Sequence, residues 1–316
     1  MTTILPIVVY SGPDFASEIV QDVMGDRYDV RTVAPEPDAL YPQLAQAVAF
    51  LDASMKVPLT PASIAAAPAL RLVSCATTGA THIDADALAA RDIPLLTLKG
   101  QTEVLRALTP AAELSWALIM ACARNLGAAL SHVNSGGWER TEFPGMMLKG
   151  RTIGIIGFGR LGQWVGRYAD AFGMTVLYHD PFQTDVPDYA TSTNLEDLVA
   201  QADIISLHLH VTPETTGLVG ADLIARFKPG SVFVNTSRSE VTDEAALADA
   251  LTNGHIAAIG VDVLSDETDL SNSPLWRLSQ THSNVLITPH IGGFSPDAVR
   301  SVVHFAATRI KEHLEG

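Results

Sequence analysis

Short apolar runs alternate with stretches of helical spacing along the chain. In the first hundred residues, apolar runs lie at 4–10, 28–33, 70–75 and 93–98, and helical stretches lie at 15–24, 60–67 and 84–90. Apolar runs of this length are typical of strands buried on both faces, as in parallel sheets. The alternation therefore predicts a small α/β domain with a parallel sheet.

The same alternation resumes after residue 150 and predicts a second α/β domain. A long apolar helix, 110–126 with Gly127 as its stop, and a loop-rich connection at 131–150 come between the two domains. We expect a helix at 243–253, with Thr242 as its cap, and a final helix at 295–313. Strands are predicted at 152–156, 175–178, 203–207, 231–235, 256–261 and 285–288.

Length and charge narrow the class of protein. A chain of 316 residues is long enough to form two domains. The formal net charge of −15 argues against nucleic acid or an anionic membrane as a partner, because both require a basic face. No apolar run approaches the roughly 20 residues that span a bilayer, and the N-terminus lacks the basic start of a secretory signal. We expect a cytoplasmic protein without a membrane partner.

The two cysteines, Cys75 and Cys122, lie in apolar segments and fit a reducing compartment. We interpret both as small core residues rather than as a disulfide or a nucleophile. Since no Cys/His cluster has metal-ligand spacing, we expect no metal site.

The glycines of Gly157-x-Gly159-x-x-Gly162 follow the strand at 152–156 and precede a predicted helix at 163–172. The next strand ends at Asp180. This is the order of a dinucleotide-binding βαβ unit, in which the glycines admit the pyrophosphate and the acid binds the adenosine ribose. A carboxylate there would repel a 2′-phosphate, and no basic residue follows it directly, so we predict NAD rather than NADP.

Beyond the glycine loop, the chain resembles the D-isomer-specific 2-hydroxyacid dehydrogenases, most closely their phosphoglycerate dehydrogenase-like members. The resemblance runs from about residue 69 to residue 290. It rests on Thr78-Gly79-x-x-x-Ile83-Asp84, Ala112-Glu113, the glycine loop with Arg160 and Leu161, Tyr178-His179-Asp180-Pro181, Ser206-Leu207-His208, Thr212-Pro213-Glu214-Thr215, Asn235-Thr236-Ser237-Arg238, Gly260-Val261-Asp262-Val263 with Glu267, and Thr288-Pro289-His290-Ile291-Gly292-Gly293.

The resemblance implies two doubly wound parallel-sheet domains. A Rossmann dinucleotide domain, residues 109–289, is inserted into a smaller flavodoxin-like substrate domain, residues 1–108 and 290–316, with the active site in the cleft. It also implies a homodimer, and we expect the apolar helix from Pro110 onward to form its interface.

The catalytic group that the resemblance implies is Arg238, Glu267 and His290. A 2-hydroxy acid loses a hydride and a hydroxyl proton on oxidation, and a histidine suits the proton step because its ordinary pKa is about 6.5. Glu267 would fix the tautomer of His290 and favour its protonated form. The Arg238 guanidinium would bind the substrate carboxylate and polarise the C2 oxygen.

Further site residues follow from the same motifs. The Thr78-Gly79 turn would offer backbone N–H groups to the carboxylate of a small anionic substrate. We also predict that Lys99 or Arg106 contacts a second acidic group, the alternative being that both are solvated hinge residues. The predicted NAD contacts are Gly157, Gly159, Arg160, Leu161, Gly162, Asp180, His208, Thr212, Thr236, Asp262 and Gly292.

The leading hypothesis is an NAD-dependent dehydrogenase of a D-2-hydroxy acid. One alternative is an NAD(H)-sensing binding protein of the same fold, and another is a phosphite-type dehydrogenase. Formate enzymes lack the glutamate–histidine pair, so Glu267 argues against formate.

Overall fold

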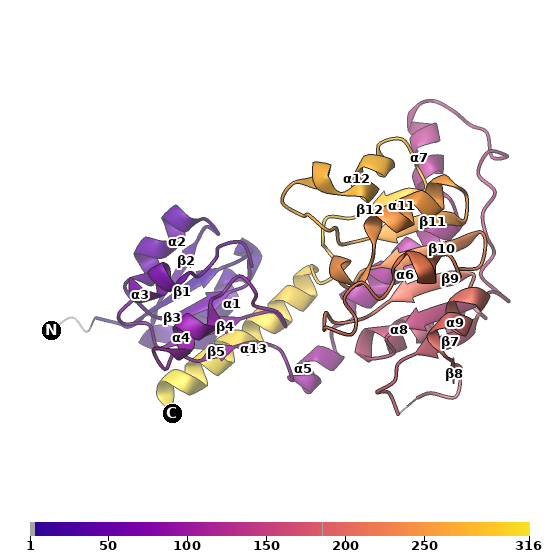
Figure 1. Cartoon of the computed structure of the whole chain (residues 1–316). Helices are drawn as coiled ribbons and strands as arrows, with labels where there is room; N and C mark the ends of the chain where they lie inside the picture. The colour runs from indigo at the N-terminus through magenta and orange to yellow at the C-terminus, as the bar shows by residue number, and fades with distance from the viewer. Residues whose placement is uncertain (1–3, 185) are drawn as a thin grey trace. The chain divides into compact units, whose positions relative to one another are not determined.

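The computed structural model describes residues 4–184 and 186–316, and these divide into two compact units (Figure 1). Unit 1 comprises the chain up to Leu108 together with Phe294–Gly316, and unit 2 is Thr109–Gly293. The first boundary coincides with the predicted one, but the second lies at 294 and not at 290. The reason is local: the backbone N–H groups of His290, Ile291 and Gly292 all donate to Asp262 of unit 2.

Unit 1 holds a parallel sheet in the order β2-β1-β3-β4-β5, the 2-1-3-4-5 order of flavodoxin-like folds. The sheet strands are β1 (Ile7–Ser11), β2 (Asp29–Val33), β3 (Ala47–Asp52), β4 (Leu72–Cys75) and β5 (Leu95–Leu96). The helices are α1 (Ser17–Met24), α2 (Pro37–Leu44), α3 (Pro61–Ala65), α4 (Ala85–Ala89), α5 (Thr102–Arg106) and α13 (Pro296–Glu315), with 3-10 turns at Asp14–Ala16 and Gly25–Arg27.

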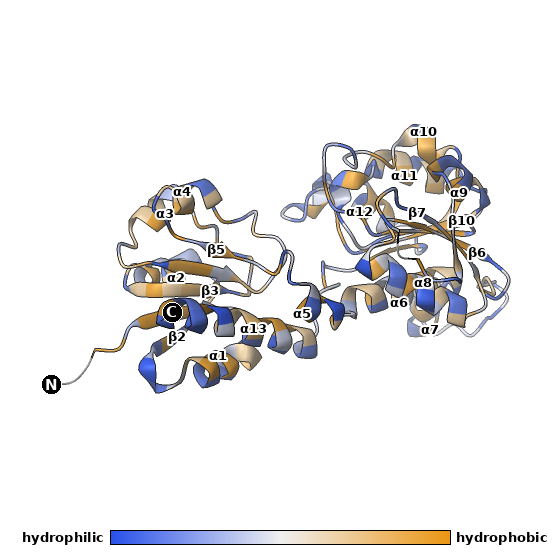
Figure 2. Cartoon of the chain, turned by 90° about the horizontal axis from the view of Figure 1, so that it is seen from below, coloured by the Kyte–Doolittle hydropathy of each residue, from blue (hydrophilic) through white to orange (hydrophobic). Residues whose placement is uncertain are grey.

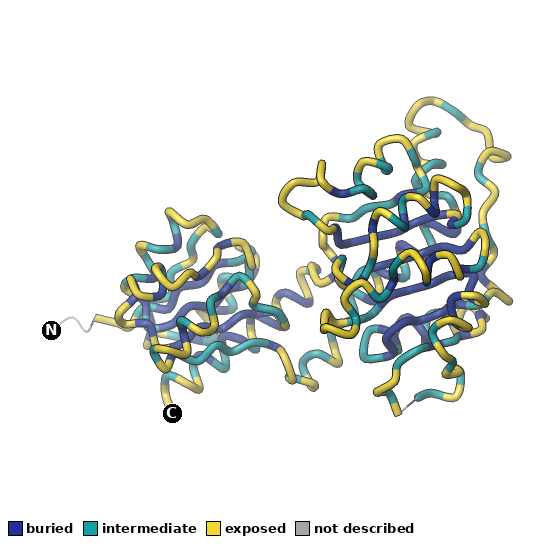
Figure 3. Tube along the Cα trace, in the orientation of Figure 1, coloured by how far each residue is buried: buried dark blue, intermediate teal, exposed yellow. Residues whose placement is uncertain are grey.

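Both faces of this sheet are covered, as the unbroken apolar runs predict. Along β1, Val8 and Tyr10 enter one core cluster and Val9 enters the other, which is the two-residue period of a strand. The first cluster includes α1 and the buried stripe of α13, so the C-terminal helix completes the domain that the N-terminal strands begin (Figure 1). In Figure 3 the central strands β1, β3 and β4 are mostly dark blue, and the outward helix faces are yellow.

Unit 2 holds a parallel sheet in the order β12-β11-β10-β9-β6-β7-β8. Numbered within the unit from β6, its order is 3-2-1-4-5-6-7, a Rossmann arrangement with one further strand. The predicted fold class is therefore confirmed. The sheet strands are β6 (Thr152–Ile156), β7 (Thr175–His179), β8 (Ala190–Ser192), β9 (Ile204–Leu207), β10 (Ser231–Asn235), β11 (Ile256–Val261) and β12 (Val285–Ile287).

Helices cover both faces of the unit 2 sheet. α6 (Pro110–Ala123) and α8 (Arg160–Ala171) pack on one face, while α9 (Leu195–Gln201), α10 (Ala221–Ile224), α11 (Glu244–Thr252) and α12 (Pro274–Ser279) cover the other. Figure 2 shows the strands mostly in orange and the helices with mixed faces. Since the strands are parallel, their carboxyl ends share one edge, where ligands bind in open α/β sheets.

The predicted helix 110–126 is wrong at its C-terminal end. α6 ends at Ala123, Asn125 turns the chain with a φ of 51°, and α7 (Leu126–Asn134) occupies part of the predicted loop. Gly127 lies inside α7 and does not stop a helix. A Cβ at Gly127 would contact the Leu286 side chain at 2.6 Å, so the glycine allows close packing on β12.

The helical stretch Thr102–Ala123 is long and apolar enough to span a membrane, by length and composition alone. This corrects the expectation that no such stretch exists. The structure divides it into α5 and α6, and six α6 residues are buried in the core of unit 2. A core helix of a soluble domain passes the same test, so the stretch is weak evidence for a membrane span.

Candidate active site

The glycine loop joins β6 to α8 as predicted, and the structure explains each glycine separately. Gly157 has a φ of 88°, and a Cβ there would collide with the His208 carbonyl. A Cβ on Gly162 would collide with the carbonyl oxygen of Gly157, so this glycine permits close packing of helix on strand. A Cβ on Gly159 would meet nothing within 4 Å. The loop thus leaves open space at the N-terminus of α8, where a pyrophosphate binds in this fold.

Asp180 directly follows β7 and ties the glycine loop to the strand edge. Its Oδ2 accepts a hydrogen bond from the Phe158 N–H at 2.8 Å, and its Oδ1 accepts one from the Phe182 N–H at 3.0 Å. Each oxygen keeps a second lone pair for a hydroxyl donor. The glycine loop and Asp180 therefore fit the pyrophosphate and ribose of a dinucleotide.

His208 follows β9, beside the glycine loop. Its Nε2 lies 2.9 Å from Ser206 Oγ, and burial lowers the pKa of His208 to about 4. The imidazole is therefore neutral near pH 7. Burial also lowers the pKa of Arg160, the first residue of α8.

Two further predicted cofactor residues are held in place by hydroxyl hydrogen bonds. Thr212 forms a local turn in which its N–H donates to Thr215 Oγ1 at 2.8 Å. Thr236, just after β10, has its hydroxyl 2.6 Å from Ser115 Oγ of α6. Ser115, which sequence reasoning missed, is fully buried and carries no motif of its own.

Asp262, which follows β11, is 2% exposed and organises the turn after β12. Its Oδ1 accepts from Thr288 Oγ1 at 2.5 Å and from the Ile291 N–H at 2.9 Å, while Oδ2 accepts from the Gly292 N–H at 2.7 Å. A Cβ on Gly292 would lie 2.9 Å from Asp262 Oδ2, which accounts for the glycine. In this structure Asp262 thus positions the histidine turn, and its predicted contact with nicotinamide stays a prediction.

Glu267 and His290 meet as predicted. His290 Nδ1 lies 3.0 and 2.9 Å from the two Glu267 carboxylate oxygens, and their side chains are 46% and 44% exposed. His290 has a φ of 52°, and its N–H donates to the carbonyls of Asp262 and Thr288. Among the described residues no group hydrogen-bonds to Nε2. The glutamate therefore fixes the ring while the second nitrogen stays accessible.

Arg238 lies in the turn after β10 (Ser231–Asn235), the neighbour of β11 in the sheet. Its side chain is exposed, and its one hydrogen bond to a described residue runs from Nη1 to the Ser237 carbonyl at 2.7 Å. The Asn235 side chain holds the turn, accepting from Ser237 and donating to the Arg238 carbonyl at 2.9 Å. The predicted catalytic residues therefore follow the carboxyl ends of three adjacent strands, β10, β11 and β12.

The predicted substrate residues belong to unit 1. Thr78 is exposed in the turn after β4, where Thr77 Oγ1 donates to the Gly79 carbonyl at 2.6 Å. Lys99 is exposed after β5, and Arg106 is exposed in the last turn of α5. No carboxylate of the described residues forms an ion pair with either cation.

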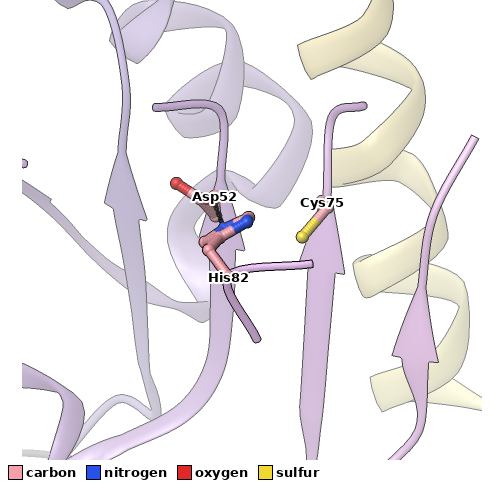
Figure 4. A group of neighbouring side chains, drawn as sticks. All are labelled: Asp52, Cys75 and His82. Carbon is pink, nitrogen blue, oxygen red and sulfur yellow. Dashed lines mark hydrogen bonds and ion pairs between the residues drawn. The ribbon is translucent and has the colours of Figure 1, made fainter. Parts of the chain in front are cut away.

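Sequence reasoning missed one polar cluster in unit 1. Asp52, Cys75 and His82 converge at the carboxyl end of the sheet (Figure 4). No local motif could have revealed it, because the first two residues are separated by a complete crossover and the third lies in a loop.

Comparison with known proteins decides the family. Residues 116–292 match "D-isomer specific 2-hydroxyacid dehydrogenase, NAD binding domain". The chain belongs to the D-isomer-specific 2-hydroxyacid dehydrogenase family. The predicted family and cofactor are confirmed, and unit 2 is its NAD-binding domain.

Two proteins of known name are similar to this chain in sequence. The D-3-phosphoglycerate dehydrogenase of Mycobacterium tuberculosis is 37% identical over 300 residues, which cover 93% of this chain and 54% of that protein. The chain thus spans about half the length of this relative. The hydroxypyruvate reductase of Thermotoga maritima is 34% identical over 235 residues, or 74% of each protein.

A solved structure extends the likeness to almost the whole chain. The D-lactate dehydrogenase of Aquifex aeolicus, complexed with NAD and lactic acid, aligns with a TM-score of 0.81 and 25% identity. The alignment covers 98% of this chain and 96% of that one, so both units have counterparts there.

Proposed function

We propose that the protein is an NAD-dependent oxidoreductase that interconverts a D-2-hydroxy acid and its 2-oxo acid. The observation that carries the proposal is the pair of His290 Nδ1 and the Glu267 carboxylate, 2.9–3.0 Å apart, at the carboxyl edge of the NAD-binding sheet. Family membership and the dehydrogenases and reductases among the relatives support the same reaction class.

The chemistry of the pair follows from its hydrogen bonding. Since Glu267 accepts from Nδ1, neutral His290 carries its proton on Nδ1 and presents the lone pair of Nε2. Nε2 takes the hydroxyl proton when the alcohol is oxidised and returns it when the oxo acid is reduced. The adjacent carboxylate stabilises the imidazolium that forms.

Arg238 binds the substrate carboxylate through two parallel hydrogen bonds and polarises the C2 oxygen. Backbone N–H groups of the Thr78-Gly79 turn assist with the carboxylate. Bound NAD would supply the acceptor for the hydride that leaves C2 in the oxidation direction. The glycine loop and Asp180 hold the pyrophosphate and the adenosine ribose.

The substrate carries, in this proposal, a second acidic group that Lys99 or Arg106 binds. The support is that both cations are exposed in one connecting segment and that neither is neutralised by a carboxylate of the described residues. If Arg106→Ala and Lys99→Ala leave kcat/KM unchanged for both phosphohydroxypyruvate and hydroxypyruvate, this part is wrong.

The test is NADH consumption against glyoxylate, pyruvate, hydroxypyruvate, phosphohydroxypyruvate, sulfopyruvate and oxaloacetate, with His290→Ala in parallel. Turnover of one acid that disappears in His290→Ala supports the proposal. NADH binding without turnover of any acid contradicts it and favours the NAD(H)-sensing alternative. Phosphite-dependent NADH formation would instead identify the phosphite-type alternative.

We also propose a cytoplasmic homodimer, with its contact on α7 rather than on α6. The six buried α6 residues are occupied by the unit's own core, whereas Leu126, Leu130 and Val133 are 43%, 62% and 49% exposed. Their spacing puts them on one face of α7. Light scattering on wild type and Leu130→Asp tests the contact. Wild type should have the mass of two chains and Leu130→Asp the mass of one. An equal mass for the two proteins contradicts the contact.

A further inference from the structure

Three metal-ligating side chains converge in unit 1, and none of them is among the residues assigned to NAD. Asp52 ends β3, Cys75 ends β4, and His82 lies in the loop that follows β4. One donor atom from each, a carboxylate oxygen, the thiol sulfur and an imidazole nitrogen, lies within 4.8 Å of the other two. Figure 4 shows the sulfur and the imidazole turned toward the same space beside the Asp52 carboxylate.

Strand register explains why two of these donors are neighbours. Asp52 pairs with Cys75 across β3 and β4, and Ser11 pairs with Asp52 across β1 and β3. Register partners in a sheet point to the same face. A row of Ser11, Asp52 and Cys75 therefore crosses three strands at their carboxyl ends, and His82 covers the row.

The cluster is buried, and part of its hydrogen-bonding capacity is unused. The side chains of His82 and Asp52 are 12% and 3% exposed, and His82 Nε2 lies 2.6 Å from Asp52 Oδ2. Within the described residues, His82 Nδ1 and Ser11 Oγ are buried without a hydrogen-bond partner. Buried polar atoms are rarely left unpaired, since each costs about 1–3 kcal/mol.

The charge of the cluster also favours a cation. The Asp52 carboxylate is held by the Ser54 N–H, by Ser54 Oγ at 2.8 Å and by His82. A divalent cation between this buried carboxylate and the neighbouring sulfur would place its positive charge beside the Asp52 carboxylate.

We propose that Asp52, Cys75 and His82 form a binding site for a borderline-soft divalent cation of the Zn²⁺ class. Thiolate, imidazole and carboxylate are the three zinc ligands in proteins, and three of them from the protein leave one position for Ser11 or water. On binding, the Cys75 thiol proton leaves to solvent, and neutral His82 keeps its one ring proton on the nitrogen that does not contact the metal. The Asp52–His82 hydrogen bond opens so that both groups contact the metal.

Cobalt provides the test, because a thiolate bound to Co²⁺ gives a charge-transfer absorption in the near ultraviolet that oxygen and nitrogen ligands do not give. The chain has two cysteines, so the signal can come only from Cys75 or Cys122. Titration of the metal-free full chain with Co²⁺ should develop this band and tetrahedral visible bands, and Zn²⁺ should abolish both. Cys122→Ser should keep the band, whereas Cys75→Ser should lose it.

Two further variants test which residues bind the metal. His82→Gln should weaken Co²⁺ affinity at least about tenfold, within the range for loss of groups that support a metal site. His290→Ala should leave the spectrum unchanged, which excludes the Glu267–His290 pair. Zn²⁺ should also raise the Tm of wild type and Cys122→Ser but not of Cys75→Ser. A thiolate band absent from wild type, or persisting in Cys75→Ser, would overturn the site.

Discussion

The two units each contain a carboxylate–histidine pair, and the pairs differ chiefly in their surroundings. Asp52–His82 in unit 1 is 2.6 Å apart with side chains 3% and 12% exposed. Glu267–His290 in unit 2 is 2.9 Å apart at its shortest, with side chains 44% and 46% exposed. The composition of the two pairs is nearly the same, but access to substrate and solvent is not.

This difference separates a reactive pair from a structural one. His290 uses Nδ1 for Glu267 and leaves Nε2 accessible, so a proton can pass to and from a substrate. His82 uses Nε2 for Asp52, and its Nδ1 is buried. A buried polar pair has given up its hydration, so removing one partner leaves the other without its hydrogen bond. Exposure, more than the identity of the two residues, indicates which pair can do acid–base chemistry.

The largest expected effect is on turnover. His290→Ala should lower kcat by about 100- to 10,000-fold, the usual contribution of a positioned acid–base group. His82→Gln should change kcat less than about tenfold, because Nε2 is bound to Asp52 and Nδ1 is buried. Steady-state kinetics with the best 2-oxo acid measure both. Equal losses in the two variants would contradict the distinction between the pairs.

The free energy of unfolding should respond in the reverse order, more to a change in the buried pair than to one in the exposed pair. Asp52→Ala should lower the free energy of unfolding by about 3–5 kcal/mol, because it leaves buried donors and His82 without their acceptor. Glu267→Ala should cost no more than about 1 kcal/mol, as exposed pairs do.

Urea unfolding followed by circular dichroism and by tryptophan fluorescence measures these changes. All four tryptophans belong to unit 2, so fluorescence reports that unit and circular dichroism reports both. A stability loss in Glu267→Ala as large as that in Asp52→Ala would contradict the prediction.

The reactive pair was predicted from the family motifs, whereas the buried pair was not predicted. Each reactive residue follows the end of a strand whose apolar run is plain, and parallel strands end at one edge. The predicted strands 231–235 and 256–261 match β10 and β11 residue for residue. In contrast, Asp52 ends β3, which was missed together with α2, because two prolines in Pro37–Leu44 obscure the helical pattern between the strands.

Residues that can cap a helix were the sequence signal for where helices begin, and this signal was correct at α3 but one residue off at α11. Thr60, the first residue of the predicted stretch 60–67, does cap α3: its Oγ1 accepts from the Ser63 N–H at 3.2 Å. For α11 the predicted cap Thr242 is wrong: Asp243 accepts from the Ala246 N–H, because a carboxylate one residue later reaches the first turn. The helices α9, α10 and α12 and the short strand β8 were not predicted, since few apolar residues define each of them.

The KM for substrate should distinguish Arg238 from another exposed arginine of unit 2. Arg238→Lys should raise KM for the 2-oxo acid about tenfold or more, because a lysine cannot form the two parallel hydrogen bonds of a guanidinium. Arg226→Lys is the matched control, since Arg226 is an exposed arginine that pairs with Glu196 at 3.3 Å. An unchanged KM in Arg238→Lys would exclude bidentate binding of the carboxylate.

The smallest expected effect concerns a third histidine, His208, which forms no ion pair with a carboxylate of the described residues. Burial lowers the pKa of His208 to about 4, against about 6.5 in an unfolded chain. Between these values the unfolded state binds the proton and the folded state does not, so stability is full above about pH 6.5 and falls as the pH decreases toward 4. Tm measured from pH 7.5 to 4.5 should therefore fall less steeply in His208→Gln than in wild type. Parallel curves would mean that His208 takes up its proton equally in both states, and that burial without an acid does not keep this imidazole neutral.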